Sequence, residues 1–230
     1  MIKKITLGII SVFFFAVTAS ADSTNIGLKA SYGKMDATGS HTTNSGSSGS
    51  GGAAVNASGN ASFPFASVFI ERQINTGSFD VAFGLDINPS TQEVDKLGGG
   101  NGFDATVDLG NLYTAYIQPM IYSNNNITLF AKVGYSQADL DIKDISRQAS
   151  ASGGTASTNN SASTDGNTSK SLEGPMYGIG LNVSVEDSSF VRVEATRTDF
   201  DEISHTNSNG KVLKADAQID AISISFGKSF

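Results

Sequence analysis

The sequence predicts an all-β protein, folded as an eight-stranded antiparallel up-and-down barrel that crosses a membrane. Apolar residues alternate with small or polar ones in eight separate segments, which is the period of a strand with one apolar face. After residue 21 no apolar run is long enough for a transmembrane helix, although 39% of the residues are hydrophobic. The chain also ends on an alternating segment, at Phe230. A barrel accounts for all three observations, because lipid covers the apolar face, the lumen takes the polar face, and closure leaves no strand edge unpaired.

The C-terminal segment shows this alternation over its whole length. Counted backward in twos, one face carries Phe230, Lys228, Phe226, Ile224 and Ile222. The other face carries Ser229, Gly227, Ser225 and Ser223. A soluble protein rarely ends on such a strand, because one face needs an apolar environment. This segment therefore favours a membrane barrel over a soluble sheet.

The N-terminus has the form of a secretory signal. Lys3 and Lys4 precede the apolar run 5–17, and Ala19-Ser20-Ala21 has the small-x-small pattern of a cleavage site. We expect residues 1–21 to be a cleaved signal peptide and residues 22–230 to form the barrel; the alternative is a retained N-terminal anchor. The chain has no cysteine, which excludes disulfides, thiolate metal sites and a lipoprotein anchor.

The first three strands are predicted at about 25–34, 63–74 and 78–88. The third has the most regular alternation, with apolar residues at every second position from Phe79 to Ile87. A helix would spread these residues around its whole circumference, so the period of two decides for a strand. Between the first two strands, the stretch 35–62 consists almost wholly of Gly, Ser, Thr, Asn and Ala, and we expect a long loop there.

The other five strands are predicted at about 105–122, 127–141, 175–185, 190–200 and from about 216 to the end. Pro119 interrupts the fourth, because proline removes a ladder hydrogen bond, and we expect a bulge near the membrane edge. A second low-complexity stretch, 143–171, predicts another long loop.

The connections alternate in length: long, short, medium, short, long, short, medium. Outer-membrane barrels have short periplasmic turns and longer extracellular loops, so both chain ends are expected on the periplasmic side. Four aromatic residues are then predicted to form a girdle at the periplasmic rim: Phe79, Tyr122, Phe190 and Phe230.

Several charged residues fall on the faces predicted to point into the lumen: Glu71, Asp80, Lys132, Arg192 and Glu194. The interior of an eight-stranded barrel is just filled by side chains and cannot hold isolated charges, so these residues should form ion pairs. One interpretation is a polar plug that fixes the packing of the barrel. The other is a narrow or gated pore whose ion pairs open and close a path.

The remaining features argue against several function classes. The formal charge of −7 disfavours nucleic acid as a partner. His41 and His205 lie among abundant serines and nearby acids, which does not amount to a catalytic arrangement, so a lipid A-modifying enzyme is the least favoured reading. A single Gly-Gly-x-Gly-x-Asp sequence at 99–104 is expected to be a flexible hairpin tip, because the calcium-binding version needs stacked copies. We predict no catalytic residues, no cofactor and no metal site.

The signal-like start, the eight alternating segments, the order of the connections and the terminal Phe230 together resemble the outer-membrane protein A-like family of small β-barrels, which includes the opacity-type surface proteins. Members of that family end on a strand that the barrel-assembly machinery reads. The residues that match its pattern are Ile222, Ile224, Phe226 and Phe230, whereas Lys228 departs from it. The resemblance implies a monomer in the outer membrane of a Gram-negative bacterium, surrounded by lipid and lipopolysaccharide.

The resemblance also implies a structural or surface-interaction role: membrane integrity, display of loops, and adhesion to host or surface ligands. The alternative is a narrow porin-like channel for small solutes.

Overall fold

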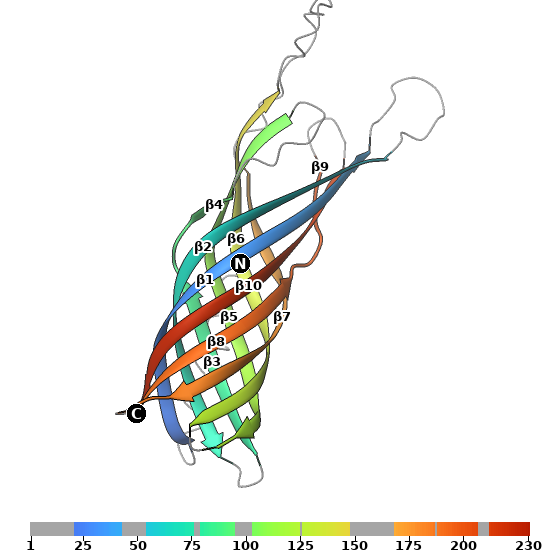
Figure 1. Cartoon of the computed structure of the whole chain (residues 1–230). Helices are drawn as coiled ribbons and strands as arrows, with labels where there is room; N and C mark the ends of the chain where they lie inside the picture. The colour runs from blue at the N-terminus through green and yellow to red at the C-terminus, as the bar shows by residue number, and fades with distance from the viewer. Residues whose placement is uncertain are drawn as a thin grey trace, which may run out of the picture.

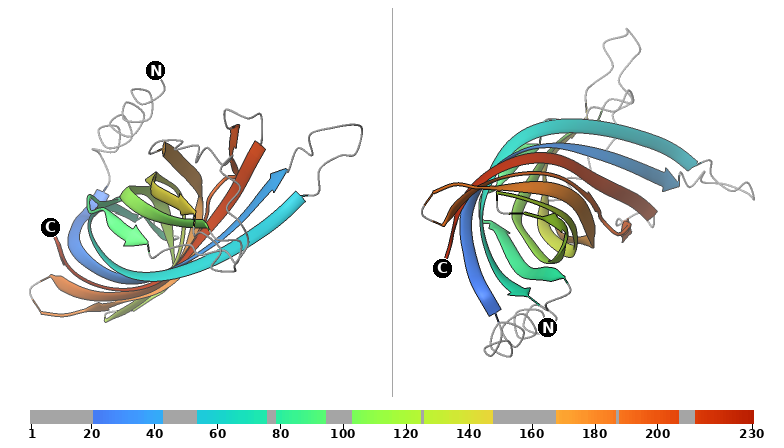
Figure 2. Two further views of the ribbon diagram at one scale, coloured as in Figure 1. Left: turned by 90° about the horizontal axis from the view of Figure 1, so that it is seen from above. Right: turned by 60° about the horizontal axis from the view of Figure 1, so that its bottom comes forward.

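The computed structural model describes residues 21–42, 54–75, 79–94, 103–124, 126–147, 168–186, 188–206 and 212–230. These segments form antiparallel strands that wrap into a tilted ring (Figures 1 and 2). No helix with the length and hydropathy to cross a bilayer occurs among the described residues. The predicted signal peptide, apart from Ala21, and the centres of the two low-complexity stretches lie outside them.

Eight long strands make up the barrel, and two short ones extend it. In chain order they are β1 (Ala21–Thr42), β2 (Ala54–Asn75), β3 (Asp80–Asn88), β4 (Gln92–Val94), β5 (Phe103–Ser123), β6 (Ile127–Arg147), β7 (Thr168–Ser184), β8 (Ser189–Asp199), β9 (Ile203–Thr206) and β10 (Val212–Ser229). Each long strand pairs with its chain neighbour, and β1 pairs with β10 to close the ring. This confirms the predicted eight-stranded up-and-down barrel.

The two short strands continue the line of the strands before them. β3 and β4 both pair with β5, and β8 and β9 both pair with β10. A local turn separates β3 from β4, in which Asn88 Oδ1 accepts a hydrogen bond from the backbone N–H of Ser90 at 3.0 Å. Each pair of strands therefore fills one position in an eight-membered ring.

The strand tilt follows from the register. Each residue can be followed to its register partner on the next strand, once around the barrel. A path that starts at Lys34 of β1 crosses β10, β8, β7, β6, β5, β3 and β2. It returns to β1 at Thr24, so the strands are staggered by ten residues around the ring. With eight strands, a shift of ten residues corresponds to a tilt of about 40°. A barrel of this size has an interior that side chains fill, so the lumen residues must pack together.

The strands reach further beyond the membrane than the sequence predicts. The predicted loop 35–62 begins and ends in strand, because β1 continues to Thr42 and β2 begins at Ala54; β6 and β7 likewise extend into the stretch 143–171. Inward-facing apolar side chains explain the extension. They form a core inside the extracellular part of the barrel: Met35, Ala61, Phe63, Leu109, Ala138, Leu140, Leu172, Phe200 and Ile219. Their polar neighbours face outward, which gives these strands a loop-like composition.

Above the membrane the ring divides into two sheets. β2 pairs with β3 only from Val68 onward, and β7 pairs with β8 only from Met176 onward. Nearer the extracellular side, one sheet therefore contains β9, β10, β1 and β2, and the other contains β4, β5, β6 and β7. Figure 1 shows the paired strands β1–β2 and β5–β6 rising beyond the other strands.

The bulge expected at Pro119 lies two residues further along, at Ile121. The register between β5 and β6 shifts between Met120 and Tyr122. A second shift between Gly110 and Tyr113 has no counterpart in the prediction; it includes Asn111, whose φ of 49° is left-handed. Asparagine is among the residues that adopt this conformation most readily.

Four aromatic side chains in the lumen lie on glycines of the neighbouring strand. The pairs stand directly opposite each other in register, so that the missing Cβ leaves room for the ring. They are Gly27–Phe69, Gly84–Tyr116, Gly180–Phe130 and Gly227–Phe190. A Cβ added to any of these glycines would lie 2.2–2.4 Å from a ring atom. The glycines are therefore part of the packing of the lumen.

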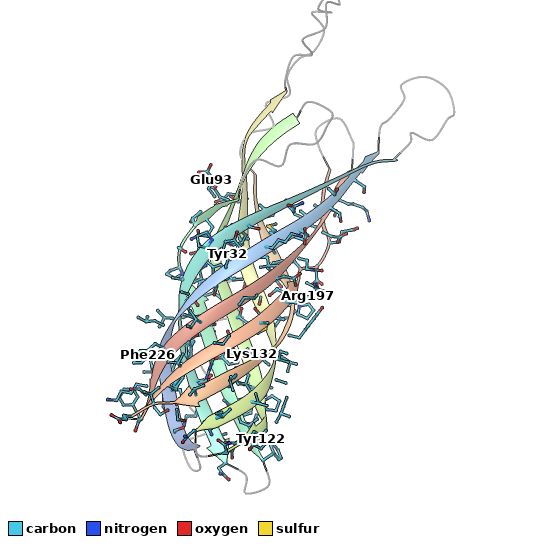
Figure 3. All side chains as sticks on the ribbon, viewed as in Figure 1. Tyr32, Glu93, Tyr122, Lys132, Arg197 and Phe226 are labelled. Carbon is cyan, nitrogen blue, oxygen red and sulfur yellow. The ribbon has the colours of Figure 1, made fainter. Side chains whose placement is uncertain are left out.

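The prediction for Phe190 was wrong. Phe190 shares the inward face of β8 with Arg192 and is only 5% exposed, so it does not belong to the girdle. Phe79, Tyr122 and Phe230 are exposed at the periplasmic end, as predicted. A second girdle, which the sequence did not predict, lies toward the extracellular end. It consists of the exposed side chains of Tyr32, Tyr113, Tyr135 and Tyr177 (Figure 3 labels Tyr32 and Tyr122).

We predict that Gly84→Ala destabilises the barrel by about 1–3 kcal/mol, because the new methyl group overlaps the Tyr116 ring in a packed interior. Urea unfolding of the refolded protein in detergent measures this. Gly39→Ala is the matched control, since the nearest atom to its Cβ is 3.3 Å away. Equal stability of the two variants would contradict the packing role of the glycine.

Candidate functional site

The lumen contains an ion network of three cations and three anions. Four of the five predicted lumen residues belong to it: Glu71, Lys132, Arg192 and Glu194. Two residues complete it that the prediction did not include, Lys29 and Asp86. All six side chains come from the inward faces of β1, β2, β3, β6 and β8, and Lys132 is labelled at mid-height in Figure 3.

The first part of the network is a doubly hydrogen-bonded pair between Arg192 and Glu71. One terminal nitrogen of Arg192 donates to Glu71 Oε2 at 3.0 Å, and the other donates to Oε1. The Asn25 amide and the Tyr116 hydroxyl also donate to this carboxylate, each at 2.9 Å. Arg192 Nε donates to Asn182 Oδ1 at 2.6 Å. Charged groups removed from water need such additional hydrogen bonds to remain ionised.

Aromatic rings surround the Arg192 guanidinium. Its central carbon lies 4.7, 5.1 and 5.2 Å from the ring centroids of Phe69, Phe130 and Phe190. These are three of the rings that pack on glycines. Aromatic faces attract cations, so the rings that fill the lumen also stabilise its charge.

The second part of the network joins two lysines to two acids. Lys132 Nζ donates to Glu194 Oε2 at 2.5 Å, and Lys29 Nζ donates to Glu194 Oε1 at 3.2 Å. Lys29 also pairs with Asp86. The Lys132 ammonium lies 4.2 Å from the centroid of the Tyr116 ring, and Tyr116 donates to Glu71. Tyr116 thus connects the two parts, and the charges of the six ionised groups sum to zero.

Asp80 is the predicted lumen residue that the structure does not bring into the network. It is the first residue of β3, opposite Asn75 at the periplasmic end, and no ion pair joins it to the other charged residues of the described lumen. It lies on the predicted face but three inward positions away from Asp86. Alternation gives the face of a strand, whereas the height within a tilted barrel depends on the register.

The same alternation carries a signal for the residues that were missed. Lys29 shares the small and polar face of β1 with Gly27 and Ser31, and Asp86 shares the inward face of β3 with Gly84. Treating every charge on those faces as a candidate would have found both. Asn25, Tyr116 and Asn182 carry no charge, and only the three-dimensional register identifies them as partners.

A small cavity of about 40 Å³ lies beside the network. Its polar lining includes Lys29, Asp86 and Glu194, and its apolar lining includes Phe65 and Ile219. Ile219 belongs to the extracellular core, and Phe65 packs against that core. The described lumen therefore contains a small chamber between the ion network and the extracellular core.

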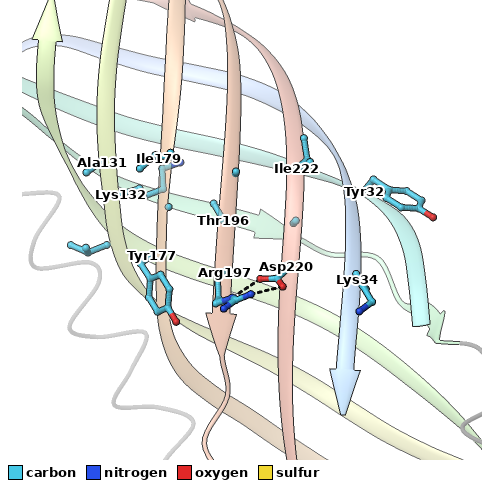
Figure 4. Close-up of a pocket in the computed structure, with 14 residues that line it drawn as sticks. Tyr32, Lys34, Ala131, Lys132, Tyr177, Ile179, Thr196, Arg197, Asp220 and Ile222 are labelled. Carbon is cyan, nitrogen blue, oxygen red and sulfur yellow. Dashed lines mark hydrogen bonds and ion pairs between the residues drawn. The ribbon is translucent and has the colours of Figure 1, made fainter. Parts of the chain in front are cut away.

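The outer surface of the barrel, toward its extracellular rim, carries a shallow groove of about 730 Å³ over Ala195, between Tyr32 on one side and Tyr177 on the other (Figure 4). Arg197 stands at one end, and its guanidinium binds both carboxylate oxygens of Asp220 at 2.6 and 2.7 Å. The groove arises where the small Ala195 lies in register between Ile222 and Ile179.

The four residues of the predicted assembly signal all lie on the outer face of the closing strand or at its end. Ile222, Ile224, Phe226 and Phe230 are exposed by 57–71%. β10 lies between β1 and β8, so these residues occupy the position where the ring closes. The side chains of His41 and His205, and residues 99–102, are outside the described part of the chain.

The sequence matches no protein-family model and no curated protein. Solved outer-membrane proteins resemble the fold at low identity. The attachment invasion locus protein Ail of Yersinia pestis is 11% identical with a TM-score of 0.46 and covers 90% of this chain and 98% of its own. Neisserial surface protein A is 10% identical with a TM-score of 0.46, covering 90% and 97%. The outer membrane protease OmpT from Escherichia coli is 10% identical with a TM-score of 0.49, covering 91% and 97%.

We predict that Arg192→Met lowers the free energy of unfolding by about 3–5 kcal/mol, because it leaves the buried Glu71 carboxylate without its cation. The double variant Glu71→Gln/Arg192→Met should lose less than the single variant, since no uncompensated charge remains. Equilibrium unfolding in lipid vesicles measures both.

The control is Arg197→Gln, which breaks the Arg197–Asp220 pair on the exposed exterior. It should cost less than about 1 kcal/mol, since ion pairs in contact with solvent contribute little. A loss as large as that of Arg192→Met would show that burial does not set the cost.

Proposed function

We propose that this outer-membrane barrel has a structural and surface-interaction role: it stabilises the membrane and presents its extracellular loops to surface ligands. The observation that carries the proposal is the neutral, fully paired ion network in the lumen. A lumen filled by ion pairs and aromatic rings favours a rigid scaffold over a path for solutes. We assign no catalytic role to any residue.

The long strand pairs β1–β2 and β5–β6 support the display role. β1, β2, β5 and β6 are each 21 or 22 residues long, which at about 3.3 Å per residue is more than a bilayer requires of a strand. An apolar core supports their projecting parts. This arrangement carries the described ends of the low-complexity segments beyond the membrane. The proposed surroundings are outer-membrane lipid and lipopolysaccharide, with insertion of a monomer by the barrel-assembly machinery.

The test separates the scaffold from the displayed segments. We predict that replacing residues 43–53 and 148–167 with short Gly-Asn turns leaves folding and resistance of the cells to detergent unchanged, and abolishes adhesion to host cells or matrix. The matched control permutes the residues of the same two segments without shortening them. Retained adhesion in the shortened variant would contradict the display role, and equal detergent sensitivity of the deletion strain and the wild type would contradict the structural role.

The alternative is a narrow pore for small solutes, and one feature favours it: Glu194 binds two lysines, so the lumen holds a carboxylate with interchangeable partners. Under the proposed function, the wild-type protein inserted in a planar bilayer shows no single-channel steps. Clear steps that change in size in Glu71→Gln or Lys132→Gln, and not in Arg197→Gln, would establish the pore.

A further inference from the structure

The outward-facing cations of the described barrel fall into two groups. Toward the extracellular end each one has an acidic partner: Lys34 with Asp36, Arg197 with Asp220 and Lys214 with Glu202. The hydrogen bond to Glu202 raises the pKa of Lys214 above its ordinary value. These cations are therefore neutralised by the protein itself.

Arg72 and Lys228 form the second group and have no ion pair with any described residue. Arg72 donates from one terminal nitrogen to Thr24 Oγ1 at 3.3 Å, and its Nε is buried without a hydrogen-bond partner. Lys228 Nζ lies 6.0 Å from the centroid of the exposed Phe230 ring. Two charged groups on the outer surface thus have no acidic group of the described protein within ion-pair distance.

The two cations lie on either side of the same strand. In register, Thr24 of β1 stands opposite Arg72 of β2, and Ile26 of β1 stands opposite Lys228 of β10. With a strand spacing of about 4.8 Å, their Cα atoms are about 12 Å apart. Both side chains are long enough to reach one group placed over β1 between them.

Their height also suits a lipid headgroup. Arg72 lies three residues before the end of β2, and Lys228 lies two residues before the exposed Phe230, so both are at the periplasmic rim. Long cationic side chains extend from the edge of the apolar belt to the headgroups. Above them, the outer faces of β1 and β10 are apolar, with Leu28 and Phe226 both exposed.

We propose that Arg72 and Lys228 form a binding site for the phosphate of an anionic phospholipid in the periplasmic leaflet. A phosphate accepts hydrogen bonds from the terminal nitrogens of the guanidinium and from the ammonium. The acyl chains lie along Ile26, Leu28 and Phe226. The site accounts for Lys228, the residue that departs from the apolar pattern of the C-terminal strand. The proposed lipid site requires that the two chain ends lie on the periplasmic side of the membrane, and it does not require the display role.

Native mass spectrometry of the detergent-solubilised barrel with added phosphatidylglycerol tests the proposal. One cation near an anionic lipid contributes about 1 kcal/mol, so Arg72→Gln or Lys228→Gln should each weaken binding about fivefold and the double variant about 30-fold. Phosphatidylcholine with the same acyl chains should bind weakly to the wild type. The matched control is Lys34→Gln/Arg197→Gln, which removes two outward cations at the opposite rim and should retain wild-type binding.

Different gel mobility of boiled and unboiled samples verifies that each variant is folded, and the two single variants decide the question if the double variant fails to fold. Binding within twofold of wild type in both single variants would overturn the proposal. So would equal losses in the control, because general charge attraction would then explain the binding. If the Arg72 and Lys228 substitutions weakened the binding of lipid A more than the binding of phosphatidylglycerol, the assignment to the periplasmic leaflet would be overturned.

Discussion

Closure of the sheet by β1 and β10 is the constraint on which the rest of this structure depends. The two strands pair continuously from Asn25–Ser229 to His41–Leu213. Lipid offers no hydrogen-bonding groups, so an open edge in the membrane would leave its backbone groups unsatisfied. Closure removes the edge and also fixes the bore, since eight strands with a shift of ten residues enclose a lumen of one width. Every inward side chain must then fit that width.

The content of the lumen follows from this restricted space. The rings of Phe69, Tyr116, Phe130 and Phe190 fit because each lies on a glycine of the neighbouring strand. The charges are tolerated because three positive groups balance three negative ones. Neutral donors give the carboxylate of Glu71 further hydrogen bonds, and aromatic rings contact the guanidinium of Arg192. Removing one partner is more disruptive than removing both, which is the general behaviour of buried ion pairs. Packing and electrostatics therefore depend on each other in this lumen.

The sequence allowed the fold to be predicted because lipid and lumen impose opposite demands on alternate residues. The period of two identified all eight long strands and the inward faces of Glu71, Lys132, Arg192 and Glu194. It failed where the solvent on the outer face changes from lipid to water: the extracellular parts of β1 and β2 have polar outer faces, and the alternation of Met35 or Phe63 is hidden among serines and asparagines. It failed again for Asp80, since partners and heights in a tilted barrel depend on register, which no single strand encodes. Phe190 is a different case, because the alternation itself places it on the inward face of β8 with Arg192.

The shift of ten residues has a consequence for how such a protein diversifies. The diameter and the strand tilt of the barrel depend on the number of strands and their stagger alone. Point substitutions in the strands therefore change the side chains that pack in the lumen and leave the diameter unchanged. Insertions in the extracellular loops meet no such geometric limit. Proteins that evolve from this chain can therefore acquire longer extracellular loops with new side chains while the membrane-spanning barrel keeps its diameter.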